Sequence, residues 1–174
     1  MSKKIRTIKF IIFCCFFLNI VSSISQTNEN VPFNNIVQHI SSKPISPIIF
    51  EDFSGNKVNL RDYFGKLVIV NFWATWCKPC QAELDAIADL YPEWQEDLNV
   101  QLVAITIDTR RQLSKVPGLL STKGWECEVY SDANNVLKNQ LGFQAIPQTY
   151  VVDKQGNILY NHSGYTSGDE YELE

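Results

Sequence analysis

The residues best suited to chemistry are two cysteines, Cys77 and Cys80, separated by only two residues. The apolar run before them, Leu67–Trp73, is typical of a strand buried on both faces. The segment after them, Lys78–Tyr91, repeats apolar residues at helical spacing. The first thiol therefore lies at a helix N-terminus, where free N–H groups and the helix dipole favour a negative charge. We expect Cys77 to be a nucleophilic thiolate and Cys80 to resolve the mixed disulfide that Cys77 forms.

Two other uses of the cysteine pair are weaker. A structural zinc site usually takes four ligands, and the rest of the chain after residue 25 offers only Cys127, His39 and His162, which are isolated in sequence. We therefore expect no metal site. A two-residue gap closes too small a loop for a purely structural disulfide to add much stability. Cys127 is expected to be a small core residue, or a partner for another chain if it is exposed.

Length and composition allow one ordinary folded domain and exclude several classes of protein. The chain has 174 residues, of which 45% are apolar and 20% charged, enough to close a hydrophobic core. It has 15 basic and 19 acidic residues, so a nucleic-acid groove is not expected. No self-similarity at a fixed period supports a repeat architecture.

The N-terminus resembles an export signal, which we assign to residues 1–25. Four basic residues and no acid open the chain, an apolar run Phe10–Leu18 follows, and Ser23 and Ser25 form a small-x-small cleavage pattern. The apolar run is too short for an ordinary membrane span, although an uncleaved anchor is the alternative. Cleavage would leave 11 basic and 19 acidic residues, a net charge of −8. Residues 26–47 are expected to be a linker, and residues 48–174 the folded domain.

Strands and helices are expected to alternate along this domain. The pattern predicts a hairpin over 48–60, strands at 67–73, 100–107 and 125–130, helices at 78–91, 108–123 and 132–141, and a terminal hairpin over 147–162. We expect Pro92 to end or kink the first helix, Pro117 to break the second, and Asp132 to cap the third. Such alternation predicts an α/β fold with a central mixed sheet flanked by helices.

The stretch Val70–Cys80 resembles the thioredoxin superfamily. The hairpin at 50–66, the strand and helix at 125–141 and the loop Ala145–Thr149 resemble the exported TlpA/ResA-like branch of that superfamily. The resemblance implies a thioredoxin-like fold with an N-terminal hairpin extension. It also implies that Pro147 is cis and faces the two cysteines, and that the backbone at Ile146 pairs with the substrate chain.

Three further residues are candidates near the cysteines. Trp76 is expected to shield the reactive cysteine and form part of the substrate surface. Glu83 lies three residues after Cys80, where it is either an acid favoured by the first helical turn or a partly buried carboxylate that transfers a proton. The resemblance favours proton transfer, because the ResA-like branch has a glutamate at this position. Asn71 is a neutral amide where cytoplasmic thioredoxins carry a buried Asp, which leaves acid–base work to Glu83 or other groups.

The expected function is an exported thiol–disulfide oxidoreductase in a bacterial periplasm or cell envelope. By resemblance it is a monomeric reductase of protein disulfides, without a cofactor, supplied with electrons by a membrane partner, and its substrates include apocytochrome c. One alternative is a peroxiredoxin-like thiol peroxidase, although no Pro lies in the segment 68–76 before the cysteine pair. Another is a non-catalytic binding module. Only twelve residues follow His162, so we expect the C-terminal helix of the thioredoxin fold to be short or missing.

Overall fold

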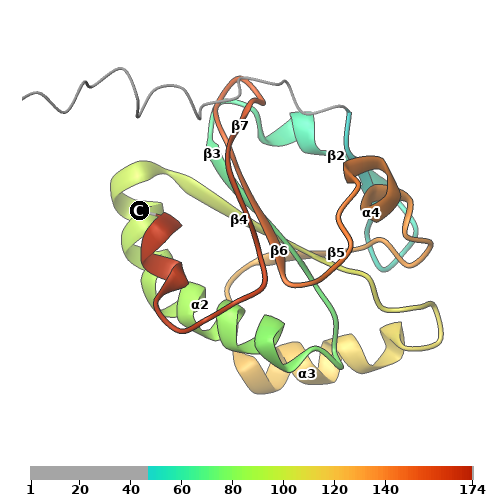
Figure 1. The fold of residues 1–174 in the computed structure, drawn as a ribbon. Coiled ribbons are helices and arrows are strands. Elements are labelled where there is room, and N and C mark those ends of the chain that lie inside the picture. Colours follow the sequence, from blue (N-terminus) through green and yellow to red (C-terminus); the bar gives the residue numbers. More distant parts are fainter. Residues whose placement is uncertain (1–46, 174) are drawn as a thin grey trace, which may run out of the picture. The chain divides into compact units, whose positions relative to one another are not determined.

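Seven strands form one mixed sheet in a computed structural model that describes residues 47–173 (Figure 1). The strand order is β2-β1-β5-β4-β3-β6-β7. Strands β3, β4 and β5 run parallel, and the other neighbouring pairs are antiparallel. The strands are β1 (Ile49–Glu51), β2 (Lys57–Asn59), β3 (Leu67–Trp73), β4 (Val100–Thr106), β5 (Glu128–Ser131), β6 (Gln148–Val152) and β7 (Ile158–Ser163). The predicted α/β class with a central mixed sheet and an N-terminal hairpin is confirmed.

Helices cover both faces of the sheet. They are α2 (Lys78–Leu98), α3 (Val116–Lys123) and α4 (Val136–Leu141), with 3-10 turns η3 (Leu60–Tyr63), η4 (Leu113–Lys115) and η5 (Asp169–Leu173). Neighbouring residues of β3 point to opposite faces, so Ile69 packs with α2, whereas Val68 and Val70 face the core that holds Val116 of α3 and Leu137 of α4. Figure 1 shows η5 beside α2. The central strands are thus buried on both faces.

Helix α2 continues past Pro92, so the predicted end at Tyr91 is wrong. Tyr91 and Trp94 are both buried in the core, and the Leu102 N–H donates to the Tyr91 hydroxyl at 3.3 Å. These contacts hold the helix on the sheet although the proline ring removes one helical hydrogen bond. The helix ends instead at Leu98, and its C-cap residue Asn99 has a left-handed φ of 54°.

The start of α3 and the start of β5 also differ from the prediction. Pro117 lies in the first turn of α3 instead of breaking a longer helix, because that turn does not need its N–H. The strand predicted at 125–130 is β5, which starts later, at Glu128. Trp125 precedes it and packs edge-on against Trp73 with ring centroids 5.4 Å apart. The tryptophan thus belongs to the core without joining the ladder.

Asp132 stabilises α4 from before its first turn. The helix starts at Val136, four residues later than predicted, and Asp132 carboxylate oxygens accept from the N–H groups of Leu137 and Lys138 at 3.1 and 3.0 Å. Asp132 therefore supplies the acceptors expected of a capping side chain, although Asn135 occupies the cap position.

The predicted N-terminal signal and the predicted short C-terminal helix concern the two ends of the chain. The predicted export signal and nearly all of the predicted linker lie outside the described residues. No helix within residues 47–173 has the length and apolar character needed to cross a membrane. After β7, the chain forms the short turn η5, where we expected a short or missing helix.

Candidate active site

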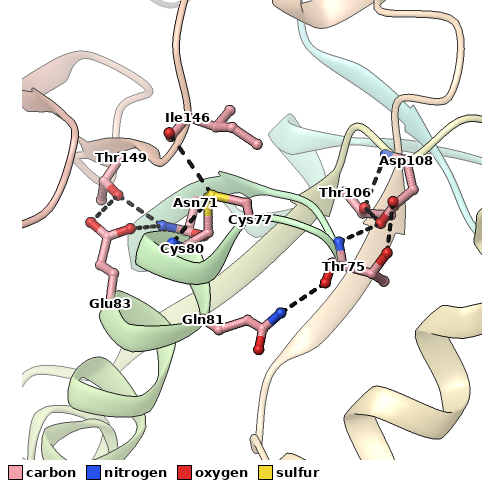
Figure 2. Close-up of a disulfide and its surroundings, with 10 residues drawn as sticks. All are labelled: Asn71, Thr75, Cys77, Cys80, Gln81, Glu83, Thr106, Asp108, Ile146 and Thr149. Carbon is pink, nitrogen blue, oxygen red and sulfur yellow. Dashed lines mark hydrogen bonds between the residues drawn. A yellow bond between two sulfur atoms is a disulfide. The ribbon is translucent and has the colours of Figure 1, made fainter.

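The cysteine pair sits where β3 gives way to α2, and the two sulfurs form a disulfide (Figure 2). Cys77 is the N-cap residue of α2, and Cys80 is in its first turn. Pro79 also lies in this turn, where its missing N–H costs nothing. Cys77 is 5% exposed and Cys80 is fully buried. An approaching disulfide therefore reaches Cys77 first.

The N-terminus of α2 favours a negative charge on the Cys77 sulfur. The Cys80 N–H donates to this sulfur at 3.3 Å, so the side chain acts as the helix cap. In the reduced protein, this N–H and the positive end of the helix dipole would stabilise the thiolate over the thiol. The geometry therefore matches the requirement for a nucleophilic cysteine.

A loop before β6 faces the disulfide. The Ile146–Pro147 peptide bond is cis, and the Ile146 carbonyl oxygen lies 3.9 Å from the Cys77 sulfur. The Gly164 N–H donates to the Pro147 carbonyl at 2.8 Å, which ties this loop to the end of β7. On the helix side, Trp76 is 56% exposed. The structure thus brings Trp76 and Ile146 to the surroundings of Cys77.

Glu83 is buried behind the cysteine pair in a cluster with Asn71 and Thr149. Its side chain is 3% exposed and accepts from Asn71 Nδ2 at 2.6 Å and from the Thr149 hydroxyl at 2.8 Å. Asn71 Nδ2 also donates to the Thr149 hydroxyl at 2.9 Å. Glu83 lies three residues after Cys80, so both project from the same face of α2.

Burial raises the pKa of the Glu83 carboxyl. The hydrogen bonds from Thr149 and Asn71 and the nearby charge of His162 act in the opposite direction, but desolvation is the largest effect. A carboxyl with a raised pKa can hold a proton at a pH where an exposed glutamate is ionised. This is the property that a proton-transfer group beside a thiol requires.

A second buried cluster, on the other side of the disulfide, was missed by the sequence analysis (Figure 2). Asp108 accepts from the Thr75 N–H and hydroxyl at 2.8 and 2.9 Å, and from the Thr106 hydroxyl at 2.7 Å. Gln81 Nε2 donates to the Thr75 carbonyl at 2.8 Å. These bonds fix the turn between β3 and Cys77. Asp108 is the second residue after β4, which lies beside β3 in the parallel part of the sheet, and that placement was the available signal.

Cys127 takes no part in the site. Its thiol packs against both halves of the core, and burial raises its pKa to about 12. It is a free cysteine, in keeping with the expected core role. Within residues 47–173, no three His, Cys, Asp or Glu side chains gather into a metal-binding group.

The fold and the cysteine pair define a thiol–disulfide oxidoreductase with a thioredoxin-like fold. The model of the AhpC/TSA family matches residues 42–161, and the chain belongs to this family. The predicted likeness to ResA-type oxidoreductases is confirmed by curated relatives.

The thiol-disulfide oxidoreductase ResA of Oceanobacillus iheyensis is 32% identical over 139 residues, which cover 80% of this chain and 69% of the relative. ResA of Bacillus anthracis is 29% identical over 124 residues, covering 71% and 70%.

Solved structures share the fold. A thioredoxin-like protein from Porphyromonas gingivalis is 39% identical, with a TM-score of 0.65 over 74% of this chain and 86% of that one. StoA from Bacillus subtilis is 19% identical, with a TM-score of 0.59 over 76% of this chain and 97% of that one, which shows the fold alone. The chain is therefore a thiol–disulfide oxidoreductase, as the sequence predicted.

Proposed function

We propose that this oxidoreductase is an exported reductase of protein disulfides, with Cys77 as the attacking and Cys80 as the resolving cysteine. One observation carries the proposal: the Cys77 sulfur caps α2, 3.3 Å from the Cys80 N–H, and its partner cysteine is fully buried behind it. A thiolate held at a helix N-terminus is the form of cysteine that attacks disulfides.

The proposed reaction moves two electrons from the cysteine pair to the substrate. The Cys77 thiolate bonds to one sulfur of a substrate disulfide, and the other substrate sulfur leaves and takes a proton from water. Cys80 then gives up its proton and attacks the Cys77 sulfur, which releases the second substrate sulfur as a thiol or thiolate. The substrate is reduced, and the protein is left with the Cys77–Cys80 disulfide that the structure contains.

Glu83 is proposed to accept the Cys80 proton and to return it when the pair is reduced again. Two observations support this role: its burial, and its place on the same face of α2 as Cys80. Asn71 and Thr149 hold the carboxylate in place. Replacement by glutamine keeps the shape but removes the proton site, so Glu83→Gln should slow disulfide exchange around neutral pH and leave the fold intact.

The substrate is proposed to lie across Trp76 and the Ile146–Pro147 loop. Trp76 offers a half-exposed aromatic surface beside Cys77, and the Ile146 backbone faces the sulfur that would carry the mixed disulfide. Backbone pairing with an extended substrate segment would align its disulfide with Cys77 without demanding a particular sequence.

The proposed compartment follows from residues 1–25, whose basic and apolar segments are typical of a secretory signal. A cysteine pair outside the cytoplasm needs a dedicated electron supply to stay reduced, so we propose a membrane-bound dithiol donor. The likeness to ResA makes apocytochrome c, before haem attachment, the substrate to test first. N-terminal sequencing of the exported protein tests the proposed cleavage after Ser25.

Trapping the mixed disulfide tests the proposed order of attack. Cys80→Ser, incubated with a protein that carries an accessible disulfide, should accumulate a covalent complex through Cys77 that dithiothreitol dissolves. The matched control Cys77→Ser should form no covalent complex. Adding Cys127→Ser to Cys80→Ser should leave the amount of trapped complex unchanged. Capture that persists without Cys77 would instead support a non-catalytic binding module.

The reduction potential of the Cys77–Cys80 pair tests the proposed direction. Equilibration with glutathione or dithiothreitol redox buffers gives this value directly. A reductase requires a potential on the reducing side, near that of thioredoxin at about −270 mV. A value near that of strong oxidants such as DsbA, about −120 mV, would overturn the reductase proposal and leave an oxidase.

A further inference from the structure

A histidine in β7 and an aspartate in η5 lie next to the cluster that holds Glu83. His162 in β7 is the direct antiparallel partner of Thr149 in β6, and Thr149 donates its hydroxyl hydrogen to Glu83. The His162 Nε2 atom is buried and lies 3.2 Å from a carboxylate oxygen of Asp169, and among residues 47–173 it has no aligned hydrogen-bond partner. Asp169 begins η5, the turn that packs beside α2.

The strand register places the histidine close to the buried carboxylate. Directly opposed residues of antiparallel strands have Cβ atoms about 5 Å apart and point to the same face. His162 therefore shares with Thr149 the sheet face on which Glu83 is bound. The Asp169 carboxylate approaches the ring nitrogen to 3.2 Å and itself accepts from the Thr166 N–H at 2.7 Å.

We propose that His162, held by Asp169, is a positioning residue whose charge sets the pH at which Glu83 exchanges its proton with the cysteine pair. This inference rests on the proposed role of Glu83. It gives the reaction a second charged group beside the buried carboxylate, because a histidine ring can carry a positive charge.

In the disulfide form that the structure describes, His162 and Asp169 are the charged groups with the largest effect on the pKa of Glu83. Its neighbours from β3 and β6 are a neutral amide and a hydroxyl. From β7 and the following loop come Tyr160 and Tyr165, whose pKa values are raised to about 12 by burial and by a hydrogen bond to a neighbouring carboxylate, so both stay neutral. A positive charge on His162 lowers the pKa of Glu83, and the negative charge of Asp169 raises it.

His162→Gln tests the inference, because glutamine stays neutral at every pH. The assay is the rate at which the prereduced protein reduces oxidised glutathione in a single turnover, measured across pH. The midpoint that Glu83→Gln abolishes is assigned to Glu83. We expect His162→Gln to move this midpoint upward, because the variant lacks the positive charge that lowers the pKa of Glu83.

A second substitution gives a shift of opposite sign. In the His162→Gln protein, only the negative charge of Asp169 remains, so adding Asp169→Asn should move the midpoint back down. Asp62→Asn is the matched control, because Asp62 also lies in a short 3-10 turn and accepts the N–H group three residues earlier, but in η3. The control should leave the midpoint in place. Local damage to the fold would not produce shifts of opposite sign.

The outcomes separate this inference from the proposed function. If Glu83→Gln leaves the pH profile unchanged, Glu83 is not the proton-transfer group and the proposed function loses that step. If Glu83→Gln abolishes the midpoint but His162→Gln does not move it, the present inference alone is wrong. A measurement on the unaltered protein serves if the variants do not fold. The Glu83 carboxyl carbon resonance should respond to titration of the His162 ring, and independent titrations would refute the coupling.

Discussion

Replacing Thr149 by valine should destabilise the protein by an amount that depends on pH. Valine keeps the branched shape of threonine in the centre of the sheet but removes the hydroxyl. In the folded protein that hydroxyl donates to Glu83 at 2.8 Å and accepts from Asn71 at 2.9 Å. The main interaction that the variant loses is therefore the hydrogen bond to the buried Glu83 carboxylate.

The expected magnitude follows from the charge of the acceptor. A hydrogen bond to an ionised group contributes about 1.5–3 kcal/mol to stability, and one between neutral groups about 1 kcal/mol. Thr149→Val should therefore lower the free energy of unfolding by about 2–3 kcal/mol when Glu83 is ionised and by about 1 kcal/mol when it is protonated. The difference between the two conditions, about 1–2 kcal/mol, is the part that reports on Glu83.

The sign follows from proton linkage. Burial raises the pKa of Glu83 in the folded state, so its contribution to stability is fully present below the unfolded pKa and is lost as pH rises through the folded pKa. The Thr149 hydrogen bond lowers that folded pKa. Without it, the pKa rises further and the loss of stability continues to higher pH. The variant should therefore be closest to the parent protein in acid.

Urea unfolding of the oxidised protein, followed by tryptophan fluorescence, measures the effect at about pH 5 and about pH 9. The intact disulfide keeps Cys77 and Cys80 from titrating. Thr149→Ser retains the hydroxyl and should show a small loss that does not change with pH. Adding Thr149→Val to Glu83→Gln should also give a loss independent of pH. If Thr149→Val causes an equal loss of stability at both pH values in the protein that retains Glu83, the hydrogen-bond argument is refuted.

Two further predictions concern groups on either side of the catalytic turn. Asp108→Ala leaves the Thr75 N–H, the half-buried Thr75 hydroxyl and the buried Thr106 hydroxyl without their acceptor, so urea unfolding should show a loss of about 3–5 kcal/mol; a loss below about 1 kcal/mol would contradict this reasoning. Because burial raises the pKa of Cys127 to about 12, iodoacetamide at neutral pH should label the reduced protein at Cys77 and leave Cys127 unmodified, as read by peptide mass spectrometry; equal labelling would contradict the burial of Cys127.

Local patterns predicted the elements that carry the site. The Val- and Ile-rich run of β3 and the two cysteines at the start of a helical pattern were sufficient to place the disulfide at a strand–helix junction. The end of α2 was not predictable from Pro92, because the buried side chain of Trp94 outweighs the local preference of proline. Pro117 suits a first helical turn as well as a helix break, so its residue type alone does not decide between the two.

The polar partners of the site were harder to predict because they come from distant strands. Thr149 lies 66 residues after Glu83, and Asp108 lies 33 residues after Thr75. Only the sheet order brings them together. Asp108 could have been found, since the carboxyl ends of neighbouring parallel strands meet at one edge. No local signal identifies Asn71 as the donor to Glu83.

The reactivity of Cys77 across pH tests the central claim most directly. In the reduced Cys80→Ser protein, Cys77 is the thiol at the start of α2, and its rate of reaction with iodoacetamide follows its thiolate fraction. The account predicts a midpoint well below the value of about 8.5 for a free cysteine. The same protein unfolded in urea should return to the free value. A folded protein whose Cys77 titrates like free cysteine would contradict the account.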